Sequence, residues 1–405
     1  MSKVIVAYRS KEFLELVESL GHEILYSIFM GDNRNPKYYL SKGKMEEIRE
    51  KADALKAERV IVDAILKSSQ WYNLENSFNI PVDDKVRLII DIFADRARSK
   101  EAMLQVEYAR LQYEIPHLRE LVHQLRSGEH PGWMGGGEYE IADYYQMIRR
   151  KMARIRRNIE KMRLQREERR KMRKKAGYIL VGIAGYTNSG KSTLLKALSG
   201  KDVVIEERMF STLSTRTSKI GKEKILITDT VGFVEDMPPW LIKAFEPTLE
   251  EIYNADIVLL CMDGSDSSEI LERKMNLSLD ILGSRVKGKI IPVINKLDMA
   301  ENLQEKIEIV RRIGEPVLIS AREGYGLEEL VERIKKEMNI KRYCLEIEHL
   351  DGEIIQFIER FGRIKKIASR EKIFVEFEMP ADKLDALHHL LDLISTGNSG
   401  GLKEI

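Results

Sequence analysis

The chain has 405 residues, of which 43% are hydrophobic and 33% are charged, and its formal net charge is only +2. This composition excludes a disordered chain and predicts a soluble protein of about two to four domains, each with its own core. The sequence has no apolar run of about eighteen residues, and its start, MSKVIVAYRSKEF, lacks the apolar core of a signal peptide. We therefore expect no membrane span and a cytoplasmic location.

Residues 1–83 are predicted to form a small α/β domain. Apolar runs typical of strands occupy 3–8, 23–30 and 59–63, and helical patterns occupy 10–21, 44–57 and 69–75. Ser10 can cap the first of these helices, and Gly21 can end it. The spacing of residues in this domain gives no catalytic pattern.

Residues 84–176 are predicted to form an antiparallel helical hairpin. The chain runs with few turn signals to Arg126 and, after the glycine-rich loop 127–138, from Tyr139 to Lys175. Apolar residues recur at spacings of four and three on both sides of the loop. They are Leu104, Tyr108, Leu111, Ile115, Leu118, Val122 and Leu125, then Ile141, Tyr145, Ile148, Met152, Ile155, Ile159 and Met162. The loop should lie at the tip, and Pro116 should kink the first helix.

The second helix of this pair is strongly basic. Residues 149–175 are mostly Arg and Lys, opposed within the segment only by Glu160, Glu167 and Glu168. Such a run can be a solvated helix face, but like charges one turn apart repel, so the helix would gain from a polyanion. RNA phosphate is the obvious candidate. The residues that we expect to contact RNA are Arg149, Arg150 and Arg154.

Residues 177–340 carry the strongest functional signal, a phosphate loop of the form GxxxxGK[ST]. An apolar strand is expected at 178–184 before this loop, and a helix at 192–198, closed by Gly200, after it. The residues expected to bind nucleotide here are Gly185, Tyr186, Thr187, Asn188, Ser189, Gly190, Lys191, Ser192 and Thr193. Lys191 would reach the β- and γ-phosphates, and Ser192 would bind Mg²⁺. Asn188 is a candidate for holding a K⁺ ion beside the phosphates.

Further nucleotide motifs follow in order, and together they predict a doubly wound sheet with its ligand at the carboxyl ends of the strands. Asp229 and Gly232 form a DxxG, in which Asp229 would hold the Mg²⁺ shell and the Gly232 N–H would sense the γ-phosphate. Asn295, Lys296 and Asp298 form an NKxD, and Ser320 and Ala321 would contact the base edge. The Asp298 carboxylate selects guanine, because adenine lacks the two donors it accepts.

The first switch must lie in 203–217, between the phosphate loop and the DxxG. Thr212 is our first choice for the threonine that closes on Mg²⁺ and the γ-phosphate, and Thr215 and Thr217 are alternatives. Lys191, Thr212 and Gly232 are thus the residues expected to act on the transferring phosphate. Phe233 follows Gly232 where a water-orienting Gln is common, so intrinsic hydrolysis should be slow, and a partner could supply the missing group. Phe233 itself is expected either to have a catalytic role or simply to pack against the sheet.

Residues 341–405 are predicted to form a small α+β domain whose function cannot be read. A strand is expected at 344–348, a helix from Glu353, a hairpin through 372–377 and a helix at 381–394. His388 and His389 on the last helix have no third ligand, so a packing or surface role is expected. The two cysteines, Cys261 and Cys344, are too few for a disulfide framework and are interpreted as packing residues.

Nearly the whole chain resembles the HflX family of ribosome-associated GTPases. The likeness rests on GYTNSGKST at Gly185, DTVGF at Asp229 and AFEPTLEEIYNAD at Ala244, and on three segments outside the nucleotide motifs. Those are NPKYYLSKGKMEEI from Asn35, SSQWYNLE from Ser69, and DIFADRARSKEAMLQVEYARLQYEIPHL from Asp91. The resemblance implies GTP hydrolysis stimulated by the large ribosomal subunit and its rRNA, and some members split ribosomes. The tip loop is shorter than the family pattern, and the first switch lacks a DPTTR-like run.

Three functions therefore stand at this stage. The first is a ribosome factor, which we expect to act as a monomer with bound Mg²⁺. The second is a nucleotide-gated RNA-binding or remodelling protein that acts away from ribosomes. The third is a protein-partner switch in which the heptad hairpin recruits another coiled coil.

Overall fold

The computed structural model describes residues 2–31, 34–126, 137–200, 216–230, 232–234, 237–349, 351–369, 372–394 and 401–405. The chain divides into two compact units, and the boundary between Arg163 and Leu164 falls inside its longest helix. The first unit holds the residues before this boundary and residues 237–247, which include the short helix α8 (Pro239–Ala244), and the second holds the rest of the described chain. Among these residues, each helix is too short or too polar to cross a lipid bilayer.

The N-terminal part of the first unit is a parallel α/β sheet with the strand order β2-β1-β3-β4. Its elements are β1 (Lys3–Tyr8), α1 (Lys11–Ser19), β2 (Glu23–Phe29), α2 (Lys42–Leu55), β3 (Arg59–Val62), α3 (Ser68–Phe78), β4 (Val82–Asp84) and α4 (Lys85–Arg96). The Ser10 hydroxyl caps α1 by accepting from the Phe13 N–H. The apolar residues of β1 are fully buried, which explains the uninterrupted apolar run in the sequence.

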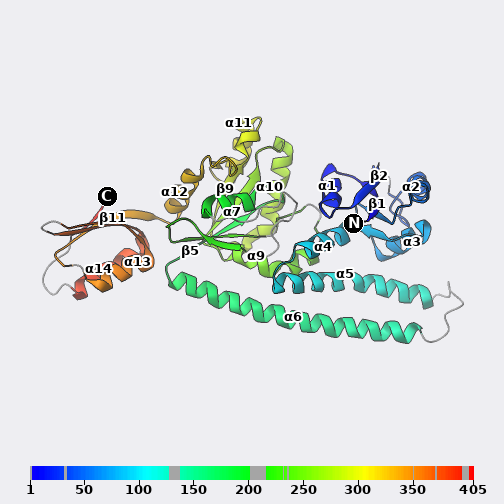
Figure 1. Ribbon diagram of the computed structural model, residues 1–405, viewed down its shortest axis with the longest axis horizontal. Coiled ribbons are helices and arrows are strands. Elements are labelled where there is room, and N and C mark those ends of the chain that lie inside the picture. The colour runs from blue at the N-terminus through cyan, green and yellow to red at the C-terminus, as the bar shows by residue number, and fades with distance from the viewer. Residues whose placement is uncertain are drawn as a thin grey trace. The chain divides into compact units, whose positions relative to one another are not determined.

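Two long helices follow, α5 (Lys100–Arg126) and α6 (Gly137–Lys175). A break at 97–99 separates α4 from α5, because Ser99 begins a new helix by accepting from the Ala102 N–H at 3.1 Å. Leu111 of α5 and Ile148 and Ile155 of α6 form a common buried cluster, and the helices lie side by side (Figure 1). Pro116 lies inside α5. Most of the expected tip loop, 127–136, lies outside the described residues.

The nucleotide motifs lie in a six-stranded sheet with the order β10-β9-β8-β5-β7-β6. All neighbouring strands are parallel except β6 and β7, which form an antiparallel hairpin. The elements are β5 (Ile179–Ala184), α7 (Lys191–Ser199), β6 (Arg216–Lys219), β7 (Ile225–Asp229), α9 (Glu246–Tyr253), β8 (Ile257–Asp263), α10 (Ser268–Leu282), β9 (Lys289–Asn295), α11 (Leu303–Arg311), β10 (Val317–Leu318) and α12 (Leu327–Glu337). Every residue of β5 and β8 is buried, so helices cover both faces of the central sheet.

The C-terminal part is an antiparallel sheet with the order β12-β13-β11-β14. Its elements are β11 (Ile340–Ile347), α13 (Gly352–Phe361), β12 (Arg363–Ser369), β13 (Ile373–Pro380), α14 (Leu384–Ile394) and β14 (Gly401–Glu404). This βαββαβ sequence with that strand order is the ferredoxin-like arrangement. Both helices lie on one face of the sheet (Figure 1), and their Ile358 and Leu387 pack on Tyr343 and Phe377 in one buried cluster.

Candidate nucleotide-binding site

Three motif segments meet at the carboxyl ends of β5, β7 and β9. In the sheet, β5 has β7 as its neighbour on one edge and β8 on the opposite edge. The direction in which the chain adds strands therefore reverses beside β5. Open α/β sheets bind ligands in the crevice at such a reversal. The phosphate loop follows β5, Asp229 ends β7 and Asn295 ends β9. The fold therefore brings together motifs that are far apart in the sequence.

Two glycines of the phosphate loop cannot be replaced without a clash. Gly185 has φ +145, and a Cβ there would lie 2.2 Å from the Cys261 carbonyl oxygen. Gly190 has φ +86, and a Cβ there would lie 2.2 Å from Nδ2 of Asn295. Asn188 between them also has a positive φ of 61. These backbone angles wrap the loop so that its N–H groups can point inward at an anion.

Lys191 begins α7 and is buried, with only 7% of its surface exposed. Its ammonium donates to the carbonyl oxygen of Tyr186 at 2.6 Å, so it lies across the loop. Burial lowers the pKa of Lys191 below its ordinary value, and the nearby Asp229 carboxylate opposes this shift. A phosphate placed here would face both the ammonium and the positive end of α7.

Ser192 and Asp229 form a pair of oxygen donors beside the loop. The Ser192 hydroxyl donates to Oδ2 of Asp229 at 2.7 Å, and Asp229 is fully buried. Hydroxyl and carboxylate oxygens are the ligands that Mg²⁺ takes together with phosphate oxygens, so this pair fits such an ion. The expected third ligand, Thr212, and its alternative Thr215 lie outside the described residues. The other alternative, Thr217, lies in β6, with its hydroxyl 3.0 Å from that of Thr228.

Gly232 and Phe233 hold the phosphate loop from the side of β7. A Cβ at Gly232 would lie 2.8 Å from Nζ of Lys191 and 2.9 Å from a methyl of Thr187, so the backbone passes directly against the loop. The Phe233 N–H donates to the Gly185 carbonyl oxygen at 3.1 Å, and its own carbonyl oxygen accepts from the Thr187 N–H at 2.8 Å. The Phe233 side chain is buried, as the packing alternative expects.

Asn295 joins the base-binding loops to the phosphate loop. Its amide donates to the Ser189 carbonyl oxygen at 2.9 Å, and its side-chain oxygen accepts from the Ala321 N–H at 2.9 Å. Asp298 is exposed and accepts from the Ser320 hydroxyl at 2.6 Å. That hydrogen bond lowers the pKa of Asp298 below its ordinary value. The carboxylate is therefore ionised and open to accept from a base.

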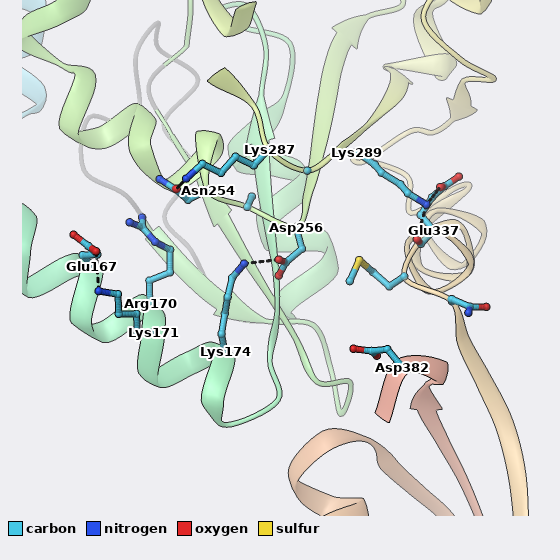
Figure 2. Close-up of a pocket in the computed structure, with 14 residues that line it drawn as sticks. Glu167, Arg170, Lys171, Lys174, Asn254, Asp256, Lys287, Lys289, Glu337 and Asp382 are labelled. Carbon is cyan, nitrogen blue, oxygen red and sulfur yellow. Dashed lines mark hydrogen bonds and ion pairs between the residues drawn. The ribbon is translucent and has the colours of Figure 1, made fainter. Parts of the chain in front are cut away.

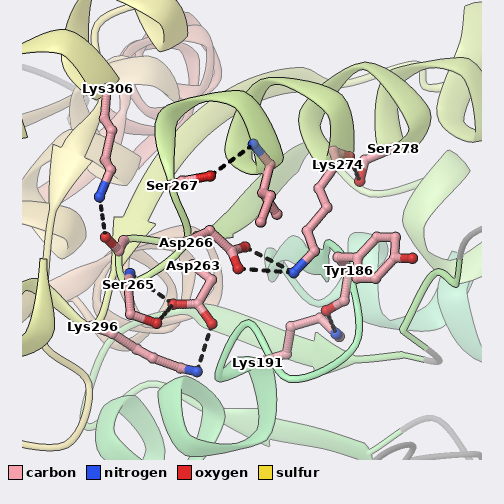
Figure 3. A network of polar contacts seen from close by, with 12 residues as sticks. Tyr186, Lys191, Asp263, Ser265, Asp266, Ser267, Lys274, Ser278, Lys296 and Lys306 are labelled. Atoms are coloured by element: carbon pink, nitrogen blue, oxygen red, sulfur yellow. Dashed lines mark hydrogen bonds and ion pairs between the residues drawn. The ribbon is translucent and has the colours of Figure 1, made fainter. Parts of the chain in front are cut away.

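The structure adds four residues that the sequence motifs do not contain. Cys261 donates from its buried thiol to the Ser189 carbonyl oxygen at 3.1 Å, and burial raises its pKa to about 11. Asp263 accepts from Lys296 at 2.6 Å and fixes that lysine (Figure 3). Asp263 had a sequence signal, since a carboxylate that ends a buried parallel strand lies at the ligand edge of the sheet.

Lys274 and Asp266 complete this group at the phosphate loop. The Lys274 ammonium lies 5.0 Å from the centre of the Tyr186 ring and donates to both carboxylate oxygens of Asp266, at 2.9 and 3.0 Å (Figure 3). This cation–π contact packs α10 against the second residue of the loop. No pattern in the sequence links Lys274 to Tyr186, because the contact depends on how α10 lies on the sheet.

A separate cleft of about 710 Å³ lies at the other end of the same sheet, where β8 and β9 begin (Figure 2). Its cations are already paired, with Lys174 2.6 Å from Asp256 and Lys289 3.1 Å from Glu337. It contains none of the nucleotide motifs. Size alone therefore does not identify the functional site of this chain.

The expected RNA contacts, Arg149, Arg150 and Arg154, are exposed on α6. Part of the basic helix has acidic partners elsewhere in the chain. Lys151 pairs with Glu107 of α5 at 2.5 Å, and Lys174 pairs with Asp256. More of the positive charge of α6 is therefore paired with carboxylates than the sequence of the helix indicates. The three arginines remain accessible to a polyanion.

Phosphate-loop, DxxG and NKxD segments on one doubly wound sheet define a P-loop GTPase. Three family models match the chain: "GTP-binding GTPase N-terminal" over 7–94, "GTP-binding GTPase Middle Region" over 96–173 and "50S ribosome-binding GTPase" over 180–296. The chain is 42% identical to GTPase HflX of Thermococcus kodakarensis, covering 80% of this chain and 76% of that one. It is 40% identical to GTPase HflX of Methanocaldococcus jannaschii, covering 84% and 85%.

The chain belongs to the HflX family, and it is a GTPase. A crystal structure of SsGBP in complex with GDP matches with a TM-score of 0.51 and 26% identity, covering 82% of this chain and 98% of that one. The expected family and the expected GTP hydrolysis are thus confirmed. The α/β multidomain fold with a P-loop GTPase domain is confirmed as well.

Proposed function

We propose that this GTPase associates with the large ribosomal subunit, which stimulates its GTP hydrolysis, and that it splits or rescues ribosomes. The observation that carries the proposal is that one segment both matches a ribosome-binding family model and contains nucleotide motifs. Residues 180–296 match a model described as a 50S ribosome-binding GTPase, and the same segment contains the phosphate loop, Asp229 and Asn295 of the nucleotide site. A soluble factor of this kind would work in the cytoplasm, as a monomer.

The nucleotide would lie along the carboxyl edge of the sheet. The loop from Gly185 to Thr193 would hold its phosphates through Lys191 and through backbone N–H groups, including those of Tyr186, Thr187, Asn188, Ser189 and Gly190. The Asp298 carboxylate would accept from guanine, with Lys296, Ser320 and Ala321 around the base and Asn295 fixing the two loops. The Gly232 N–H would contact the γ-phosphate.

Ser192, Asp229 and Thr212 would hold Mg²⁺, which supplies positive charge to the phosphate oxygens when bound. Asn188, with its positive φ in the loop, would take part in holding K⁺. Hydrolysis without a partner should be slow, because buried Phe233 occupies the position of a water-orienting Gln. A group supplied by the ribosome would then raise the rate by about 10³ to 10⁵ fold.

The parts of the chain outside 177–340 would bind the large ribosomal subunit and so bring the GTPase domain to it. We propose an N-terminal domain at 1–83, a hairpin at 84–176 and a C-terminal domain at 341–405, with Arg149, Arg150 and Arg154 on rRNA phosphates. The apolar heptad positions of α5 and α6 pack on each other. This packing argues against the alternative in which the hairpin recruits another coiled coil.

The deciding experiment measures steady-state GTP hydrolysis with and without purified large subunits, at fixed salt, in K⁺ and in Na⁺. We expect subunits to raise turnover at least tenfold and K⁺ to support faster turnover than Na⁺. Separation of joined ribosomes into subunits, followed on sucrose gradients, then tests splitting. GTP binding without any stimulation by subunits would contradict the proposal and favour an RNA-remodelling protein that acts off the ribosome. Equal rates in the two salts would remove K⁺ from the site.

A further inference from the structure

A network of ion pairs joins the turn of the β6–β7 hairpin to the C-terminal sheet. Glu223 lies in this turn, and its carboxylate contacts Arg363 and Lys365 of β12 and Lys335 of α12. Nζ of Lys335 is 3.4 Å from Glu223 and 3.2 Å from the Glu378 carboxylate on β13. The Glu223 carboxylate is thus shared by three cations, two from β12 and one from α12.

The centre of the network is largely shielded from solvent, and its two β12 cations are partly exposed. The exposed fractions of the side chains are 8% for Lys335, 11% for Glu378 and 14% for Glu223, against 24% for Lys365 and 29% for Arg363. Lys365 closes it, since its ammonium lies 3.1 Å from Glu378. Buried charges have lost their hydration, so loss of one partner leaves the others uncompensated. The turn is therefore held in place by the C-terminal part, unlike a turn whose charges are solvated.

The β6–β7 hairpin connects this network of ion pairs, called the joint below, to the nucleotide site. Its strands pair from Lys219–Leu226 near the turn to Arg216–Asp229 at the far end. β6 is the edge strand and is hydrogen-bonded to β7 within the described sheet. Asp229 at the far end accepts from Ser192 at 2.7 Å. Because a strand rises about 3.4 Å per residue, the four steps from Ile225 to Asp229 separate the start of β7 from Asp229 by about 14 Å.

We infer that Glu223 is a positioning residue for the nucleotide site. Through the β6–β7 hairpin, Glu223 fixes Asp229 relative to Ser192 and thereby slows GDP release. The inference rests on the proposed roles of Asp229 and Ser192 toward Mg²⁺. The cations of the network come later in the chain than residue 296, where the last matched family model ends.

The test uses the full-length chain loaded with a fluorescent GDP and measures its release into excess unlabelled GDP, in Mg²⁺ and in EDTA. Glu223→Gln keeps the size of the side chain and removes its charge. We expect GDP release at least fivefold faster than in the unaltered chain when Mg²⁺ is present, and equal rates in EDTA. The matched control is Glu346→Gln, which removes the 2.7 Å ion pair with Lys372 from the same C-terminal sheet. That variant should release GDP at the unaltered rate.

Arg363→Gln removes one of the three cation contacts of Glu223 and should accelerate release by no more than Glu223→Gln does. The double variant with Glu223→Gln should be no faster than the faster single variant, because both changes break one joint. Unchanged release in both single variants would overturn the inference, even if their melting temperatures fell. Equal acceleration in EDTA, or in Glu346→Gln, would overturn it too.

A further variant separates this inference from the proposed site. Asp229→Asn should abolish the Mg²⁺ dependence of GDP release. If Asp229→Asn keeps that dependence, the proposed magnesium role fails, and the role of Glu223 fails with it. If Asp229→Asn loses it while Glu223→Gln behaves like the unaltered chain, only the role of Glu223 fails.

Discussion

The side-chain amide of Asn295 donates to the carbonyl oxygen of Ser189 at 2.9 Å, across 106 positions of sequence. The same side chain accepts from the Ala321 N–H on its other face. Asn295 is only 2% exposed, so neither hydrogen bond competes with water. The first residue of the NKxD motif therefore holds the phosphate loop and the loop after β10 together, so it could affect nucleotide binding without touching the base.

We expect Asn295→Ala to weaken GDP and GTP binding equally, by at least tenfold. It should also lower the free energy of unfolding by about 1–3 kcal/mol, because the Ala321 N–H loses its partner and the Ser189 carbonyl oxygen keeps only the Cys261 thiol. Calorimetric titration and urea unfolding measure the two effects. Asn276→Ala, at an exposed position of α10, is the control and should change neither. Loss of GTP binding alone would show that Asn295 acts at the γ-phosphate instead.

Gly232→Ala should separate GDP binding from GTP hydrolysis. The added methyl would lie 2.8 Å from Nζ of Lys191, beside the Gly232 N–H that is expected to contact the γ-phosphate, and away from the base. We expect turnover to fall at least about a hundredfold, which corresponds to about 2.7 kcal/mol in the barrier, with GDP affinity within about threefold. Gly43→Ala, in a helix with open space around it, is the control and should leave turnover unchanged. An equal loss of GDP affinity would contradict this separation.

Lys191 and the exposed arginines of α6 should act on different ligands. Lys191→Ala should abolish nucleotide binding and leave RNA binding unchanged. Reversing the charges of Arg149, Arg150 and Arg154 should do the opposite and should reduce the slope of log affinity against log salt by about 3. Filter binding of rRNA fragments at several salt concentrations, with nucleotide titrations alongside, measures both. RNA affinity that barely depends on salt would rule out phosphate contacts by this helix.

Two buried groups of the N-terminal part should give opposite pH dependences of stability. Burial raises the pKa of Asp84 to about 6 and lowers that of His117 to about 4. Both contact Tyr113, which donates to Asp84 at 3.0 Å and packs edge-on against His117. Asp84 is protonated more readily in the folded state, so its contribution is lost as pH rises from about 4 to 6. His117 is protonated more readily in the unfolded state, so its contribution is lost as pH falls through the same window.

Between pH 4 and 6 these two terms should largely cancel in the free energy of unfolding, because they have opposite signs and each is of order 3 kcal/mol at most. Relative to the unaltered chain, Asp84→Asn should make stability fall more on acidification, because the Asp84 term no longer opposes the His117 term. His117→Gln should make stability rise on acidification over the same range. Urea unfolding followed at several pH values measures all three. The same sign of slope in both variants would show that these groups do not carry the pH dependence.

Local pattern was enough to predict most elements and the nucleotide motifs. The phosphate loop, DxxG and NKxD are short segments whose chemistry depends on residue type and spacing, so Lys191, Asp229 and Asp298 could be found from the sequence. Strand and helix positions followed from apolar periodicity, although β4, β6 and β14 were not predicted. These strands are short, and their pairing with other segments decides whether they form at all.

The sequence by itself determined that this chain binds a guanine nucleotide and which family it resembles. Only the tertiary structure decided that Asn295 lies on Ser189, that Lys274 covers Tyr186 and that Glu223 meets cations of the C-terminal part. The physical reason is that each of these contacts joins residues from separate elements. Whether these residues come into contact depends on strand order and helix packing, and local sequence patterns do not predict either.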